Sequence, residues 1–260
     1  KQLHISRSPE LGGGVSDYPT GENILCGIDS YEICQASFPL NTQVTLDASP
    51  NEGYEFSHWE INDLAMADVD GSIPVTMSEN KDVIAVFVPV LKFPLSGTLE
   101  SRELAHFFFS DTWDCAQCGQ CPTGTYKLHV GADLSATYNY QNEVGERVDA
   151  AHAGVVKKIF TDQHLTWADA IVIESDDGQF TTVYWHVIKY GNLAENDPVT
   201  KGQQIATIAD LGDNTHFHFG IRMAPYSYPE SLAGALPVAD GCGYLAFPEK
   251  FIDPKAAIYE

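Results

Sequence analysis

Four histidines and one aspartate have the types and spacing of a metal-dependent hydrolytic site. They are His129, Asp133, His186, His216 and His218, and the histidines lie beside apolar residues in strand-like runs. A catalytic zinc ion typically takes three ligands from histidine and carboxylate side chains and leaves a fourth position for water. The chemistry that this set could supply is therefore metal-assisted hydrolysis, in which any histidine that does not bind the metal can move protons.

The first two of these residues, His129 and Asp133, are four positions apart, with Gly131 between them. In a strand, an even offset places both side chains on one face. A regular strand would hold them roughly 13 Å apart, which is too far for two ligands of one ion. We therefore expect the chain to bend at Gly131, the residue that best tolerates a bulge or a positive φ.

The pair His216 and His218 flanks Phe217. Their offset of two again gives one face, with the Cα atoms roughly 6.6 Å apart. Both imidazoles could bind one ion from there, or one could bind while the other stands beside the water, and the spacing leaves both arrangements open. Phe217 and Phe219 are expected on the opposite face, where they would pack in the core and hold the strand rigid.

His186 ends the largely apolar run of residues 181–186. An isolated histidine in such a run is usually a buried and satisfied core residue. From a strand end it could also extend into the same cleft as the other histidines. Taken alone, its surroundings favour the core.

The elements that must position these residues are mostly strands. Alternating and β-branched runs predict them at residues 127–134, 154–160, 170–174, 180–187, 203–208 and 216–222. Short helices are expected at residues 100–107 and 254–259. The pattern has no βαβ rhythm, which argues against a nucleotide-binding doubly wound fold.

The N-terminal third also reads as short strands separated by turn residues, such as Gly12-Gly13-Gly14 and Asp70-Gly71. Two prolines in residues 88–94 would interrupt a ladder, so we place a linker there. The sequence thus predicts a small all-β domain at residues 1–90 and a second, mainly β domain at residues 91–260.

The composition limits the partners that the chain can have. Its 260 residues carry a formal charge of −22, which disfavours attraction to nucleic acid or to an anionic membrane. No apolar stretch is long enough to span a bilayer, and the first residues lack a signal-peptide pattern. Oligomeric state cannot be inferred from these features.

Six cysteines form an even set: Cys26, Cys34, Cys115, Cys118, Cys121 and Cys242. The CxxC spacing at residues 115–121 suggests either a zinc knuckle or a redox motif, but structural disulfides are favoured. An oxidising compartment fits this usage better than the cytosol. We expect a mature secreted or periplasmic protein whose export signal has been removed.

Residues 3–88 resemble the bacterial repeat module related to internalin B-repeats. The resemblance rests on the order of the glycine-rich turn, Cys26, Cys34, the segment 53–59 and the segment 85–87. It implies a local disulfide between Cys26 and Cys34, and it implies that Tyr54 and Trp59 are core residues.

The later part of the chain resembles the lysostaphin and LasA type of zinc metallopeptidase, also called the LytM type. The matching residues are His129 with Asp133, Gly145 to Val156, Tyr184-Trp185-His186, Lys201-Gly202-Gln203 and Thr215 to Phe219. The resemblance implies an antiparallel β-sheet domain that holds one zinc ion per chain. It assigns His129, Asp133 and His218 as zinc ligands, and His186 and His216 as catalytic residues.

The activity implied by this resemblance is that of an endopeptidase that cuts stem peptides or cross-bridges of bacterial peptidoglycan. The alternatives are an exported protease of glycine-rich proteins and, less favoured because no ligand is missing, a non-catalytic wall-binding or regulatory protein. No residue determines which peptide bond is cut. The N-terminal module could bind, act as a spacer or cover the site.

Overall fold

The computed structural model describes residues 1–18, 23–28, 30–66, 70–106, 112–114, 126–128, 131–135, 143–161, 168–226 and 250–259. Strands dominate these residues, and the helical segments among them are three-residue 3-10 turns. The mainly β fold predicted from the sequence is confirmed. The chain divides into two compact units, Lys1–Val90 and Leu91–Glu260. Among the described helices, none has the length and apolar character needed to cross a membrane.

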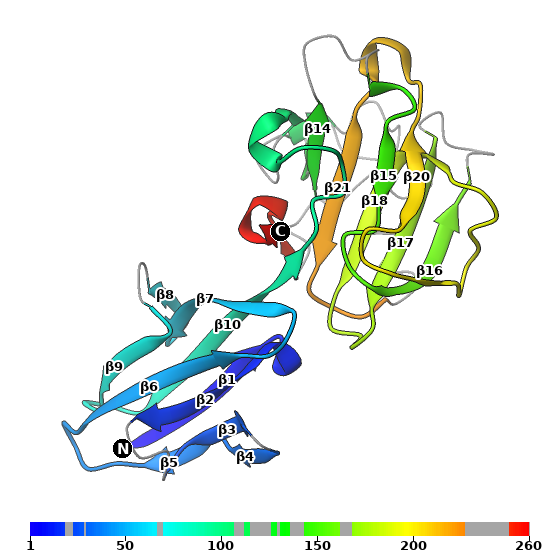
Figure 1. Cartoon of the computed structure of the whole chain (residues 1–260). Coiled ribbons are helices and arrows are strands. Elements are labelled where there is room, and N and C mark those ends of the chain that lie inside the picture. The colour runs from blue at the N-terminus through cyan, green and yellow to red at the C-terminus, as the bar shows by residue number, and fades with distance from the viewer. Residues whose placement is uncertain are drawn as a thin grey trace. The chain divides into compact units, whose positions relative to one another are not determined.

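The first unit contains two five-strand arrays. Its strands are β1 (Gln2–Ser8), β2 (Gly13–Tyr18), β3 (Leu25–Ile28), β4 (Tyr31–Ile33), β5 (Gln35–Ser37), β6 (Gln43–Pro50), β7 (Tyr54–Ile61), β8 (Leu64–Met66), β9 (Ser72–Thr76) and β10 (Lys81–Leu91). One array has the order β5-β1-β10-β7-β8 and the other the order β4-β3-β2-β6-β9 (Figure 1). The β1–β10 pair is parallel, whereas the neighbouring pairs β5–β1, β10–β7 and β7–β8 are antiparallel.

Buried and exposed residues alternate along the strands of this unit, and the buried ones form its core. Trp59 of β7 and Phe87 of β10 are almost completely buried, and Tyr54 is also buried. The reading of Tyr54 and Trp59 as core residues is therefore correct. Gly13 of β2 lies so close to the Phe87 ring that any Cβ there would collide with it, so glycine lets the second array approach the first.

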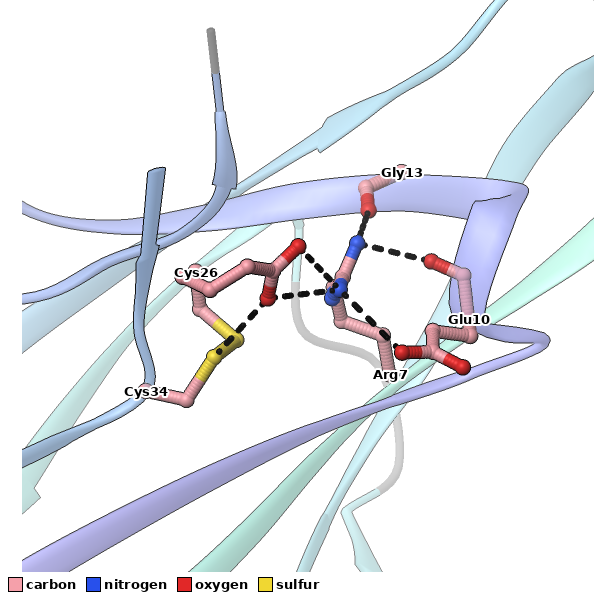
Figure 2. The surroundings of a disulfide bond; sticks show 6 residues. Arg7, Glu10, Gly13, Cys26 and Cys34 are labelled. Atoms are coloured by element: carbon pink, nitrogen blue, oxygen red, sulfur yellow. Dashed lines mark hydrogen bonds and ion pairs between the residues drawn. A yellow bond between two sulfur atoms is a disulfide. The ribbon is translucent and has the colours of Figure 1, made fainter. Parts of the chain in front are cut away.

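A disulfide joins Cys26 and Cys34, as the repeat resemblance implied. Beside it lies the guanidinium of Arg7, which is only 6% exposed (Figure 2). Its Nη1 donates to the carbonyl oxygens of Glu10 at 2.7 Å and Gly13 at 3.2 Å, and its Nη2 donates to both carboxylate oxygens of Glu32 at 3.0 Å. The buried charge is thus paired and hydrogen-bonded, as a buried cation must be.

The second unit is built on one large antiparallel sheet. Its main path has the order β11 (Glu103–His106), β14 (Ala132–Ser135), β21 (Phe217–Arg222), β18 (Thr181–Lys189), β17 (Asp169–Ser175), β16 (Gly154–Phe160) and β19 (Pro198–Val199). Strand β20 (Gln204–Ile208) pairs with β18 and with β15 (Arg147–Asp149), and β22 (Phe251–Ile252) pairs with β21. A separate hairpin pairs β12 (Thr112–Asp114) with β13 (Tyr126–Leu128). Figure 1 shows β14, β21, β18, β17 and β16 side by side.

Several expected elements were wrong. Residues 103–106 are strand β11 rather than helix, because they pair with β14 at the sheet edge. The expected C-terminal helix is a short 3-10 turn, Pro254–Ala256, followed by β23 (Ile258–Tyr259). The linker expected at residues 88–94 begins inside β10, which continues to Leu91, and the two units divide within it, between Val90 and Leu91. The single strand expected at residues 127–134 is two strands, β13 and β14, and Gly131 lies in a bend before the second.

The large sheet separates an aromatic core from the face that carries the candidate site. Phe217 and Phe219 of β21 pack against Tyr184 of β18, with ring centroids 6.4 and 5.4 Å from that of Tyr184. All three are fully buried. As expected from strand alternation, His218 therefore lies on the other face.

Candidate metal centre

The site begins as a row of residues across three strands. Asp133 of β14 is the direct register partner of His218 on β21, and His218 is also the direct partner of Trp185 on β18. Direct partners in an antiparallel pair project from the same face. One line perpendicular to the strands therefore carries a carboxylate, an imidazole and an indole side by side.

The carboxylate of Asp133 contacts two imidazoles. Its Oδ1 lies 2.9 Å from Nδ1 of His218, and its Oδ2 lies 3.4 Å from Nε2 of His216. Asp133 and His218 are almost completely buried, and His216 is 8% exposed. Charged and polar groups are retained in such a place only when they are paired or bind a metal.

His216 comes immediately before β21, at the end of the loop that leaves β20. Its Nδ1 lies 2.6 Å from the carbonyl oxygen of Asn214. Because a carbonyl oxygen only accepts, Nδ1 carries the proton, and Nε2 is the nitrogen that faces Asp133. The loop itself is braced by Thr215, whose hydroxyl donates to the carbonyl of Gly212 and accepts from the amide of Leu211. Backbone contacts thus orient the imidazole.

His186 lies at the point where β18 exchanges one neighbour for another. Up to Trp185, β18 pairs with β21, and from Val187 onward it pairs with β20 on that edge. On the other edge, the register with β17 shifts, so that Trp185 faces Ala170 and Val187 faces Asp169. His186 is thus the extra residue of a β-bulge.

The backbone of His186 has φ of 64°, a left-handed conformation that is uncommon for any residue except glycine. Its carbonyl accepts a hydrogen bond from the amide of Ala209 at 2.9 Å, which ties the bulge to the loop after β20. Bulges next to active sites re-aim side chains, and strained backbone clusters at functional sites. The strand expected at residues 180–187 continues to Lys189, so His186 lies within β18 and not at its end.

The bulge places the His186 ring among the other histidines. Its centroid is 4.3 Å from that of His216 and 6.3 Å from that of His218. The structure therefore brings together four of the five predicted site residues: Asp133, His186, His216 and His218. The fifth, His129, lies outside the described residues, as do Cys115, Cys118, Cys121 and Cys242.

The donor set fits a zinc ion. Two ligands that are each about 2.0–2.2 Å from a tetrahedral ion stand about 3.3 Å apart, and the 2.9 Å between Nδ1 of His218 and Oδ1 of Asp133 needs only a small adjustment. A Cβ on Gly131 would lie 2.6 Å from Nε2 of His218 and 2.5 Å from the carbonyl oxygen of Phe219. Glycine at this position therefore leaves room for the imidazole.

A different buried histidine belongs to the opposite face. Nε2 of His152 lies 2.8 Å from the hydroxyl of Thr182, whose oxygen is 3.1 Å from the hydroxyl of Tyr184. Burial lowers the pKa of His152 to about 4, so this imidazole is neutral at pH 7. Burial also raises the pKa of the Tyr184 phenol. These groups are a structural network within the core.

Sequence reasoning did not identify two features of the site. In the sequence Trp185 stands out only as part of the motif Tyr184-Trp185-His186, yet its ring stacks on His186 with centroids 4.3 Å apart. The bulge at His186 has no signal in the sequence, because glycine or asparagine would be the usual marker of a left-handed residue. Both features result from how β18 pairs with its neighbours.

An antiparallel sheet that bears a buried carboxylate among three imidazoles carries the donor types that metal-dependent hydrolases use, and so defines a candidate metal site of that class. Within that class, residues 128–228 match the description "Peptidase family M23", and residues 32–91 match "Divergent InlB B-repeat domain". The chain thus contains an M23 peptidase domain preceded by a divergent InlB B-repeat domain. Both resemblances inferred from the sequence are confirmed.

Several solved bacterial structures match parts of this chain. The catalytic domain of the antimicrobial peptidase lysostaphin from Staphylococcus simulans is 21% identical with a TM-score of 0.36, over 50% of this chain and 86% of that one. A zinc-containing peptidase from Vibrio cholerae is 19% identical with a TM-score of 0.38, over 70% of this chain and 48% of that one. A chain of the SpoIIQ–SpoIIIAH pore-forming complex is 21% identical with a TM-score of 0.37, over 53% of this chain and 87% of that one.

This chain spans about half the length of the Vibrio peptidase. A comparison with curated proteins gives no match.

Proposed function

We propose that the second unit is a zinc-dependent endopeptidase that hydrolyses peptide bonds of bacterial peptidoglycan, in stem peptides or cross-bridges. The observation that carries the proposal is the contact of one buried carboxylate, Asp133, with both His218 and His216. The match to the M23 family supports a metallopeptidase. We assign His129, Asp133 and His218 as the ligands of one zinc ion per chain.

When bound, zinc would polarise the scissile carbonyl and make a nearby water more acidic. Side chains of the protein would carry out the proton transfers. His186 and His216, whose ring centroids are 4.3 Å apart, would orient the water and accept its proton as its oxygen attacks the carbonyl carbon. The same proton would pass to the amide nitrogen as the C–N bond breaks, so the imidazoles end the cycle unchanged.

A hydrogen bond to the backbone orients His216. Because Nδ1 of His216 donates to the carbonyl of Asn214, the ring cannot turn without losing this hydrogen bond. Nε2 stays directed at the carboxylate of Asp133. An imidazole held in this way can also stabilise the oxyanion of the tetrahedral intermediate.

We further propose that the protein acts outside the cytoplasm as a mature secreted or periplasmic form. The Cys26–Cys34 disulfide supports this location, because such bonds persist in oxidising compartments. The substrate would be a peptide, and a peptide rich in glycine is as compatible with the residues as a peptidoglycan stem. The InlB-type domain would bind the target or act as a spacer between the target and the peptidase domain.

The test measures zinc content and hydrolysis by the full chain. Purified peptidoglycan, a pentaglycine peptide and an elastin-like glycine-rich protein serve as substrates for wild type, His186→Ala and a control, His4→Ala. The control removes an exposed histidine of the first unit. About one zinc per chain, with cleavage lost in His186→Ala and retained in His4→Ala, supports the enzyme.

The substrate that is cleaved decides between the wall and a glycine-rich protein. Bound zinc without cleavage of any of the three would favour the binding or regulatory role instead. A chain that binds no zinc would contradict the proposal as a whole.

A further inference from the structure

Trp185 lies against two of the site histidines. Its ring stacks on that of His186, with centroids 4.3 Å apart and planes 19° from parallel. It meets His218 edge to face, at 5.6 Å and 75°. Trp185 is therefore in contact with one proposed catalytic histidine and one proposed metal ligand.

This stack cannot form on a regular strand. Consecutive residues of a strand project from opposite faces, so the side chains of Trp185 and His186 would be separated by the sheet. The bulge and the positive φ of His186 bring its ring to the Trp185 side. The stack and the strained backbone are therefore parts of one arrangement.

The indole is anchored on its own side of the sheet by apolar packing. Trp185 is 7% exposed and forms a buried cluster with Ala170, Val172 and Val183, against which Phe160 and Tyr226 also pack. Among the described residues, its indole Nε1 has no hydrogen-bond partner, although a buried tryptophan usually finds one. The contacts that orient the indole are therefore the apolar packing and the stack on His186.

We propose that Trp185 is a positioning residue for His186, a role that rests on the proposed function. The indole plane fixes the rotation of the imidazole about its χ2 bond and so determines where the two ring nitrogens point. A group that moves a proton must stand within hydrogen-bond reach of it. A displacement of about 1 Å in such a group can lower the rate about 100-fold.

The experiment compares three variants of the full, zinc-loaded chain. Trp185→Leu keeps an apolar side chain but removes the ring, and Trp185→Phe keeps a ring. Val183→Ala is the matched control, because Val183 lies two residues away on the same strand and in the same cluster. The measurements are zinc content, kcat and KM on the cleaved substrate, and the NMR cross-relaxation (NOE) between the ring protons of His186 and His216.

In wild type, an NOE is expected between the ring protons of His186 and His216, since their ring centroids are 4.3 Å apart. Trp185→Leu should weaken that NOE, because the imidazole can then rotate, and lower kcat about 100-fold, with KM changed by less than about 3-fold and zinc still bound. Trp185→Phe should keep part of both the NOE and kcat, and Val183→Ala should keep both.

The inference is overturned if Trp185→Leu leaves the NOE between His186 and His216 and kcat at wild-type values. It is also overturned if Val183→Ala lowers kcat as much as Trp185→Leu does, because packing alone would then explain the loss. A wild-type chain that cleaves none of the substrates would contradict the proposed function. In that case the NOE between His186 and His216 in the Leu and Ala variants would still decide whether Trp185 orients the ring.

Discussion

Asp133 and His218 are direct register partners on β14 and β21, and their side chains meet with Oδ1 and Nδ1 2.9 Å apart. The two residues are 85 positions apart in the chain. Sheet pairing therefore fixes a contact that no local sequence pattern could produce.

Replacing Asp133 with asparagine should weaken zinc binding by more than about 100-fold, since changes outside the ligand set already cost about 10- to 100-fold. Asparagine keeps the shape of the side chain but removes the negative charge. Competition with a chromophoric chelator measures the affinity. Asp213→Asn, which changes an exposed carboxylate in the loop before His216, serves as the control. Equal affinities in the two variants would exclude Asp133 as a ligand.

Gly131→Ala should disturb the same centre by steric means. The added Cβ would lie 2.5 Å from the carbonyl oxygen of Phe219 and 2.6 Å from His218 Nε2, so β14 or the imidazole must move. We expect the second unit to lose about 1–3 kcal/mol of unfolding free energy, as overpacked sites do. Gly71→Ala is the control, because its Cβ would make only an ordinary 3.4 Å contact.

Urea unfolding and zinc titration report the two effects of Gly131→Ala. Wild-type stability together with wild-type zinc affinity would show that the space beside His218 is not needed.

The stability of the second unit should decrease in acid because of His152. Burial lowers its folded-state pKa to about 4, opposed only in part by its hydrogen bond to Ala153. The unfolded chain has a pKa of about 6.5 and so binds more protons between these two values. The unfolding free energy contributed by His152 is therefore intact above about pH 6.5 and falls by at most about 3 kcal/mol as the pH drops to about 4.

This prediction is checked by urea unfolding at about pH 7 and about pH 4.5 with a chelator present, so that metal release does not contribute. A His152→Gln variant cannot gain the proton, and its pH dependence should be flatter than that of wild type. Parallel pH profiles for the two proteins would show that His152 is not responsible.

Arg7→Met should destabilise the first unit by about 1–3 kcal/mol, because it leaves the exposed carbonyl of Glu10 and the partly buried carbonyl of Gly13 without their donor. Glu32→Gln should cost less than about 1 kcal/mol, since the Glu32 side chain is 61% exposed. The fluorescence of Trp59, which is buried in this unit, can follow urea unfolding. A larger loss in Glu32→Gln would mean that the ion pair, not the carbonyl contacts, dominates.

Much of the fold could be predicted from local pattern. Strands such as β16 and β17 were expected close to their observed bounds, because alternation and β-branched residues mark a half-buried strand. Residues 103–106 were expected to be helical but form strand β11, because pairing with β14 at the sheet edge decides their conformation. Local propensity carries no information about such a distant partner.

The sequence by itself determined which residues could form the site. The spacing of His216 and His218 placed them on one face, the glycine at 131 allowed a bend, and the motif order indicated a metallopeptidase of the LytM type. The roles of His129 and the other ligands stay a prediction. Only the tertiary structure decided that Asp133 faces His218 across a sheet and that a bulge turns His186 onto Trp185. The physical reason is that side-chain periodicity is local, whereas register and bulges arise from hydrogen bonds between strands far apart in the chain.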